Sequence, residues 1–114
     1  MQNEANVDPV AKPLISTHAP IAATDAVVTL AAAETKFHVL DWVAYSYSAS
    51  PTGGALTVTI GGTTVFQVAI TAAGPGMFDF SDAPIYTITK NQAMVITLAS
   101  GGGAVVGKLN TRTR

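Results

Sequence analysis

Residues Gly102 to Lys108 are the segment of this chain that comes closest to a known catalytic motif. They match the first part of a phosphate-binding loop, G-x-x-x-x-G-K. A nucleotide site also needs Ser or Thr at the next position to hold magnesium, with a strand before the loop and a helix after it. Leu109 occupies that next position. We therefore interpret 100–103 as a flexible Gly turn that leads into the last strand, with Lys108 on its polar face.

His18 and His38 are the two candidate general bases. Asp41 follows His38 by three residues, and in a strand this spacing places the two side chains on opposite faces. The carboxylate therefore cannot orient the imidazole locally, and no Gly-x-Ser-x-Gly sequence supplies a nucleophile. We expect no catalytic site, no cofactor and no enzymatic activity.

Asp79 and Asp82 flank Phe80 and Ser81 and could supply oxygen ligands to calcium. Two carboxylates are a small ligand set for that ion. Asp residues at such positions commonly accept hydrogen bonds from their own backbone in a turn. We expect a solvated turn here, and no metal.

Four aromatic residues could form a sugar-stacking platform if they were exposed together: Trp42, Tyr45, Tyr47 and Tyr86. Packing in a core or an interface is the interpretation that we favour for them. Arg112 and Arg114, in the Thr-Arg-Thr-Arg tail, either contact an acidic surface of another protein or form a solvated terminus. The sequence leaves both alternatives open.

Charge is the most informative property of the composition. Only 11% of the 114 residues are charged, against roughly a quarter in an ordinary soluble domain. Thr, Ser, Ala and Gly fill the positions that charged residues would normally occupy at the surface. Since the cores of protein interfaces are depleted in charge, we expect much of this surface to be covered by protein. A monomeric β domain is the alternative.

The same composition restricts the partners. The net charge of −1 provides no basic field for phosphates, so we expect no nucleic-acid partner. With no cysteine there is no disulfide framework and no thiolate zinc site. No apolar stretch reaches membrane-spanning length and no signal peptide is visible, so we expect no membrane partner.

The chain divides into an arm and one domain. Over residues 1–24 the recurring Pro9, Pro13 and Pro20 block a helix and favour an extended arm. Residues 25–114 alternate short Thr- and Val-rich runs with Gly, Pro, Asp and Ser, a pattern typical of strands. The expected strands are 26–32, 36–48, 55–60, 64–70, 77–80, 85–89, 93–99 and 104–111.

About eight short antiparallel strands predict an all-β sandwich with a jelly-roll arrangement, and an immunoglobulin-like sandwich is the alternative. In the segment 36–48, Leu40 and Trp42 are predicted on one face and Tyr45 and Tyr47 on the other. Both faces look at least half buried, which favours oligomerisation.

The hairpin around Gly61 and Gly62 tests the strand register. A plain two-residue turn would place Phe66 on the Thr face, whereas pairing Val58 with Phe66 and Leu56 with Val68 keeps the apolar side chains together. We therefore predict one extra residue within 61–63, as a three-residue loop or a bulge.

From residue 28 to residue 110 the sequence resembles small jelly-roll proteins of tailed bacteriophages, of the capsid-decoration or head-fibre type. The shared features are turns and strands: VTLAAA at 28–33, SAS at 48–50, GGTTVF at 61–66, AAGP at 72–75, FDF at 78–80, LASGG at 98–102 and GKLN at 107–110. The resemblance implies a tumour-necrosis-factor-like homotrimer and no chemistry.

This resemblance, taken with the low charge and the all-β pattern, implies a virion structural protein that is assembled in the host cytoplasm. Its expected partners are copies of itself, as a trimer, and the major capsid protein or another virion protein. A receptor- or carbohydrate-binding module of a tail tip or fibre is the alternative. The candidate contacts with other subunits or the shell are Leu14, Ile15, Ile21, Trp42, Tyr45, Tyr47, Arg112 and Arg114.

Overall fold

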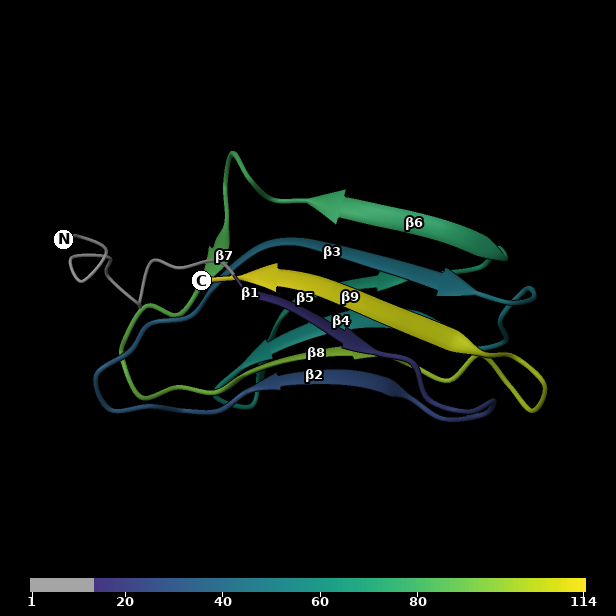
Figure 1. The fold of residues 1–114 in the computed structure, drawn as a ribbon, viewed down its shortest axis with the longest axis horizontal. Helices are drawn as coiled ribbons and strands as arrows, with labels where there is room; N and C mark the ends of the chain where they lie inside the picture. Colours follow the sequence, from purple (N-terminus) through teal and green to yellow (C-terminus); the bar gives the residue numbers. More distant parts are fainter. Residues whose placement is uncertain (1–13) are drawn as a thin grey trace, which may run out of the picture.

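The computed structural model describes residues 14–114, which form nine β-strands and no helix (Figure 1). Within these residues no helix is therefore long and apolar enough to cross a membrane. The strands are β1 (Leu14–His18), β2 (Ala26–Leu30), β3 (Val39–Tyr47), β4 (Ala55–Ile60), β5 (Thr63–Ala69), β6 (Gly74–Asp79), β7 (Ile85–Tyr86), β8 (Met94–Leu98) and β9 (Gly107–Thr113).

The strands form two antiparallel sheets that pack as a sandwich (Figure 1). Sheet A has the order β1-β9-β3-β6, with the short β7 paired to the start of β3, and sheet B has the order β2-β8-β4-β5. The first strand pairs with the last and the second with the last but one, while β3 and β4 continue the two sheets. This alternation of the chain between sheets is the jelly-roll arrangement, and it confirms the predicted fold class.

The core is filled by alternate residues of both sheets, because successive side chains of a strand point to opposite faces. In β8, Met94, Ile96 and Leu98 are all fully buried, as the sequence pattern predicted. Leu56 and Val58 of β4 and Leu109 of β9 are likewise inaccessible to water. The strands of sheet B thus turn an apolar face inward against sheet A.

The β4–β5 hairpin has the predicted strand pairing but a different turn. Val58 pairs with Phe66 and Leu56 with Val68, as expected. Gly61 and Gly62 form a two-residue turn, with φ of 56° and 85°, which only glycine adopts readily. The register shifts between Val58 and Thr59, so the extra residue lies in β5 and not within 61–63. The predicted position of the bulge was wrong by a few residues.

A second irregularity, in β3, corrects the predicted faces of that strand. Between β3 and β9 the register shifts between Leu40 and Trp42, which leaves Asp41 as an extra residue. Leu40 therefore points into the core together with Val43 and Tyr47, while Trp42 points outward. The expectation that Leu40 and Trp42 share a face was wrong, because a bulge reverses the alternation at that point.

Strand β1 lies inside the segment that we interpreted as an arm. It pairs with β9 over its whole length, from Leu14 with Thr113 to His18 with Leu109. His18 Nδ1 also accepts a hydrogen bond of 2.8 Å from the backbone N–H of Val27 in β2. Residues 14–18 are therefore the edge strand of sheet A, and residues 19–24 connect it to β2. The first part of the expected arm, 1–13, lies outside the described residues.

Aromatic side chains close the side of the sandwich where the edge strands β5 and β6 meet. The Phe66 ring of β5 packs edge-on against Phe78 and Phe80, with centroids 5.5 and 5.2 Å apart. Tyr45 stacks on Phe78 and lies over Gly76, where a Cβ atom would collide with the Tyr45 ring. This close approach explains why β6 has glycine at position 76. Pro75 is compatible with the strand because β6 lies at the edge of sheet A.

We expect Leu109→Ala to lower the free energy of unfolding by about 2–5 kcal/mol, because it opens a cavity where β9 pairs with both β1 and β3. The matched control is Lys108→Ala, whose exposed side chain lies on the opposite face, and it should change stability by less than about 0.5 kcal/mol. Urea denaturation at one fixed protein concentration measures both. Equal effects of the two substitutions would contradict this assignment of the core.

Candidate functional site

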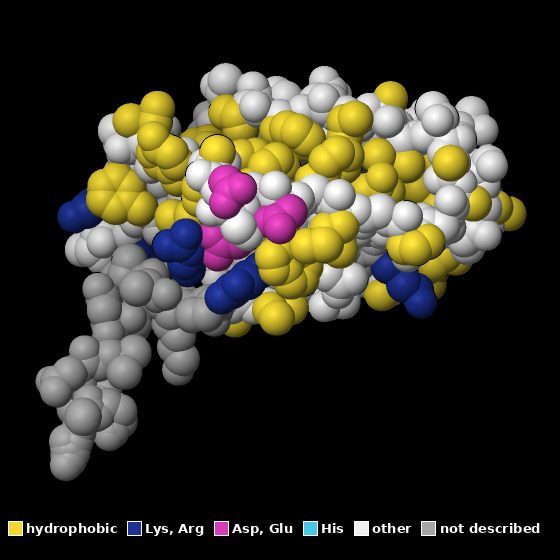
Figure 2. All heavy atoms as spheres, turned by 90° about the horizontal axis from the view of Figure 1, so that it is seen from above, with side chains coloured by type: hydrophobic (Ala, Val, Ile, Leu, Met, Phe, Trp, Pro, Cys, Tyr) yellow, Lys and Arg dark blue, Asp and Glu magenta, His cyan; other side chains and the backbone are white. Residues whose placement is uncertain are grey.

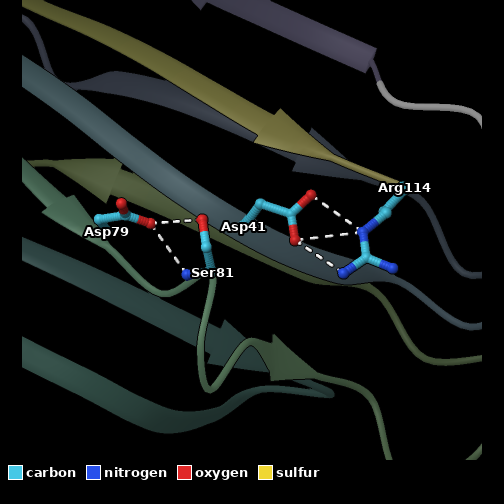
Figure 3. Close-up of polar contacts among 4 residues, drawn as sticks. All are labelled: Asp41, Asp79, Ser81 and Arg114. Carbon is cyan, nitrogen blue, oxygen red and sulfur yellow. Dashed lines mark hydrogen bonds and ion pairs between the residues drawn. The ribbon is translucent and has the colours of Figure 1, made fainter.

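An ion pair joins the bulge of β3 to the end of the chain (Figure 3). Arg114 donates from Nε to both carboxylate oxygens of Asp41, at 3.1 and 3.0 Å, and from Nη2 to Oδ1 at 3.0 Å. These hydrogen bonds and the charge of Asp41 raise the pKa of Arg114 above its usual value. Asp41 is only 4% exposed, and the guanidinium of Arg114 is the partner that balances its buried charge.

Asp79 caps its own turn, as the sequence analysis predicted (Figure 3). One of its carboxylate oxygens accepts hydrogen bonds from the backbone N–H and the hydroxyl of Ser81, at 2.9 and 2.5 Å. The hydrogen bond from the Ser81 hydroxyl has the larger effect and the one from the Ser81 backbone N–H the smaller; both lower the pKa of Asp79 below its usual value. Among residues 14–114, no three His, Asp or Glu side chains lie close enough together to hold a metal ion.

The remaining candidate groups for catalysis hold loops in place. His38 Nε2 lies 2.8 Å from the carbonyl oxygen of Ala31, and the backbone of His38 exchanges two hydrogen bonds with Thr87. The carboxylate of Asp41 is bound to Arg114 and does not orient His38. The Gly-rich segment before Lys108 is a turn that leads into β9, as predicted.

The four aromatic residues of the hypothetical sugar platform are separated by the fold. Tyr47 is 2% exposed, and its hydroxyl donates a 2.6 Å hydrogen bond to the carbonyl of Ala99. Burial raises the pKa of the Tyr47 hydroxyl. Tyr45 stacks on Phe78 at the side of the core. Trp42 is half-buried on the outward face of sheet A, and Tyr86 lies in β7. They therefore provide no common stacking surface.

An apolar groove of about 560 Å³ opens at one end of the sandwich. The β4–β5 turn forms one wall, and β7 with the connection to β8 forms the other. Tyr86 is 58% exposed and Ile88 is 82% exposed, although both are large and apolar. Its lining residues are Ile60, Thr63, Val65, Pro84, Ile85, Tyr86, Ile88, Thr89 and Gln92. This groove is the candidate binding surface that the sequence analysis missed.

The predicted contact residues lie in three different settings. Leu14, Ile15 and Ile21 are exposed near β1, while Tyr47 lies in the core and Tyr45 at its margin. Arg112 and Trp42 are cross-strand neighbours on the outward face of sheet A, and Arg114 is bound to Asp41. Seen from the β6 side, acidic and basic groups lie together amid hydrophobic side chains (Figure 2).

The sequence analysis missed several exposed apolar residues: Phe37, Val65, Met77 and Ile88. A strand was expected over 85–89, but pairing ends at Tyr86, and this leaves Ile88 outside any sheet. Val65 is exposed because it lies at the β5 bulge. A local sequence pattern carries no signal for either event, since both depend on how strands pair across the sheet.

No protein-family model and no curated protein matches this chain. Among solved structures, it is similar to the CBM36-1 domain of a multidomain xylanase from the hindgut metagenome of Trinervitermes trinervoides. The identity is 11%, the match covers 90% of this chain and 95% of that one, and the TM-score is 0.50. At this identity the likeness establishes the fold alone, and that carbohydrate-binding module shares the jelly-roll sandwich.

Two further structures superpose less well. A ruminal GH26 endo-β-1,4-mannanase matches with 13% identity and a TM-score of 0.44. The match covers 81% of this chain but only 18% of the mannanase chain. A structure of infectious bursal disease virus, Gx strain, matches with 15% identity and a TM-score of 0.37, over 94% of this chain and 32% of that one.

We expect Arg114→Ala to lower the melting temperature of the protein, because the buried carboxylate of Asp41 loses its charged hydrogen-bond donor. Arg112→Ala is the matched control: it removes the same charge two residues earlier, from the last strand β9, but leaves the ion pair intact. Thermal denaturation of both variants at neutral pH measures the difference. A larger loss for Arg112→Ala would show that the ion pair does not fasten the end of β9.

Proposed function

We propose that this chain is a non-catalytic structural protein of a tailed-bacteriophage virion. In this proposal it forms a symmetric homotrimer on the outer shell, as a capsid decoration or head-fibre protein. Its partners are its own copies and the major capsid protein or another virion protein, and it joins the particle in the host cytoplasm. The jelly-roll fold and the sequence resemblance to small phage proteins support this assignment.

The observation that carries the proposal is the amount of large apolar surface left in water. Tyr86, Ile88 and Val65 surround the groove, and Leu14, Ile15 and Ile21 lie exposed along β1 and the segment after it. Few charged residues accompany them, since only 11% of the residues of the whole chain are charged. Extended apolar patches on a soluble protein mark surfaces that another protein covers.

Three titratable groups considered above, Asp41, Asp79 and His38, support a non-catalytic role, because each has a structural partner. Asp41 is bound by Arg114, Asp79 by Ser81, and His38 by the backbone around Ala31. A catalytic base is expected to face a cavity with its reactive atom free to meet a substrate. The apolar groove is instead lined by hydrophobic, Thr and Gln side chains.

A symmetric oligomer also explains how a surface without strong anchor residues can hold a shell. Three weak contacts held at fixed geometry raise the overall affinity by roughly two to four orders of magnitude over one contact. Under this proposal no single ion pair has to provide the binding energy. The exposed apolar side chains of each copy need only contribute a small share.

We expect size-exclusion chromatography with light scattering to give three times the chain mass of 11.7 kDa at micromolar concentration. The purified protein should also co-sediment with phage shells that lack it, and should not bind host cells. Heat-unfolded protein in the same sedimentation assay controls for nonspecific adsorption. A stable 11.7 kDa monomer that ignores the shells would overturn the proposal.

A receptor- or carbohydrate-binding module of a tail tip or fibre is the second candidate. The exposed Tyr86 favours it, because it lines the groove together with Gln92, and a site with an aromatic ring and an amide group suits a sugar. The jelly-roll fold is compatible with both functions.

Under this second candidate, Tyr86→Ala should weaken binding to host cells or to an immobilised glycan by about tenfold. Phe37→Ala is the control, since Phe37 is an exposed aromatic residue that does not line the groove. Binding isotherms of the wild-type protein and both variants on whole cells provide the measurement. Equal loss in both variants, or no binding by the wild type, would exclude the groove as a receptor site.

A further inference from the structure

Strand β1 is held to the sandwich mainly through its backbone. It pairs with β9, in a register that sets Ser16 opposite Thr111, and within residues 14–114 its other edge has no strand partner. None of its five side chains is fully buried, and Leu14 and Ile15 are 57% and 63% exposed. The core therefore loses little if this strand leaves, whereas the edge of β9 loses a row of backbone hydrogen-bond partners.

The connection from β1 to β2 is strained where it folds back (Figure 1). Ala23 lies in its turn with φ of 62°, a left-handed conformation that is costly for a residue with a Cβ atom. Its backbone N–H donates a 3.1 Å hydrogen bond to the carbonyl of Val105, which holds the turn. Pro20 fixes its own φ and disfavours the helical conformation for Ala19, so this part of the connection favours an extended path.

The same connection carries the large apolar side chain of Ile21, which is 81% exposed in a single copy. Nothing in the turn requires an apolar residue of this size at this position. A connection that crosses from one copy to the next runs between the two, and there the Ile21 side chain leaves water. Short strained hinges are also the segments at which proteins exchange elements between copies.

We propose that β1 is exchanged between copies, so that the β1 of each chain pairs with the β9 of the next. The inference rests on the self-association proposed above and names the segment and the edge responsible for it. The receiving edge needs no new surface, because it makes the contacts already formed within one chain. Ser16 again lies opposite Thr111, and the backbone N–H of Val27 in the receiving copy donates to His18 Nδ1. Exchange of an identical element is a low-cost route to an oligomer.

Exchange of β1 is compatible with a closed ring of three copies. The strand that is given, β1, and the edge that receives it, on β9, are different surfaces of the chain. A contact of this heterologous type forms a ring where the rotation between copies closes, whereas a contact between two identical patches gives a twofold pair. Each copy in the ring gives one strand and receives one, so no β9 edge is left unpaired.

A disulfide across the β1–β9 pair identifies the chain to which each β1 belongs. Thr17 and Asn110 are cross-strand partners, and their side-chain oxygens lie 2.7 Å apart. Because the chain has no cysteine, Thr17→Cys combined with Asn110→Cys introduces two thiols that meet in either arrangement. After oxidation, we expect a denaturing gel without reductant to show three times the chain mass of 11.7 kDa, since every bond joins two copies. Reductant should restore the single-chain band.

The matched control is Thr57→Cys combined with Gln67→Cys. These residues are likewise cross-strand partners, but they belong to the β4–β5 hairpin, whose two-residue turn keeps them in one chain. The oxidised control should therefore run at the mass of a single chain. Thr17→Cys alone should give no covalent trimer, because one thiol per chain joins two copies at most.

The turn provides a second measurement that needs no cross-link. We expect Ala23→Gly to shift the equilibrium toward the single chain by about tenfold, because glycine adopts the left-handed conformation of the folded-back turn without the steric cost. Ala22→Gly is the control, since the preceding residue has no positive φ, and it should not favour the single chain. Light scattering over a dilution series measures both. An equal shift in the two variants would contradict the role of the strained turn.

The possible outcomes separate the two proposals. If the wild type is oligomeric but the oxidised β1–β9 variant runs as a single chain, self-association stands and the exchange of β1 is refuted. Thiols that stay free in this variant while the hairpin control oxidises would also refute it, because the exchange requires the β1–β9 pair. If the wild type is monomeric, the proposed self-association fails, and this inference fails with it.

Discussion

The alternation of side chains along each strand is the constraint from which the rest of this structure follows. Each of the two sheets has one face in the core, so the side chains before and after every inward residue of a strand point outward. Met94, Ile96 and Leu98 are buried because sheet B packs on sheet A, and Val95 and Thr97 are outward for the same reason. The composition of the outer faces is therefore a separate property, which selection can adjust without changing the core.

Where that alternation is regular, the sequence predicts the structure closely. The bounds of β4 agree with the predicted 55–60, and the partners of Val58 and Leu56 in β5 were found from the requirement that apolar side chains share a face. The extra residue was placed in the turn, whereas Gly61 and Gly62 close a two-residue turn and the bulge lies in β5. The apolar pattern fixes the pairing of side chains, but it does not say which residue absorbs the mismatch.

Where strand pairing is distant in the sequence, local patterns fail. β1 pairs with the last strand, and no property of residues 14–18 taken alone indicates that a partner lies at 109–113. The bulge at Asp41 has the same origin: it depends on the register with β9, so Leu40 and Trp42 were placed on one face although only Leu40 points into the core. The exposed Ile88 was missed because β7 ends early. The candidate surfaces were therefore less predictable than the fold.

The two outer faces give the molecule two sides with different physical properties. Sheet A carries Asp79, Arg112 and Lys108 outward, and such charges keep a surface hydrated. Sheet B carries none, so hydrating it gains little, and covering it removes Val and Thr methyl groups from water at no cost in buried charge.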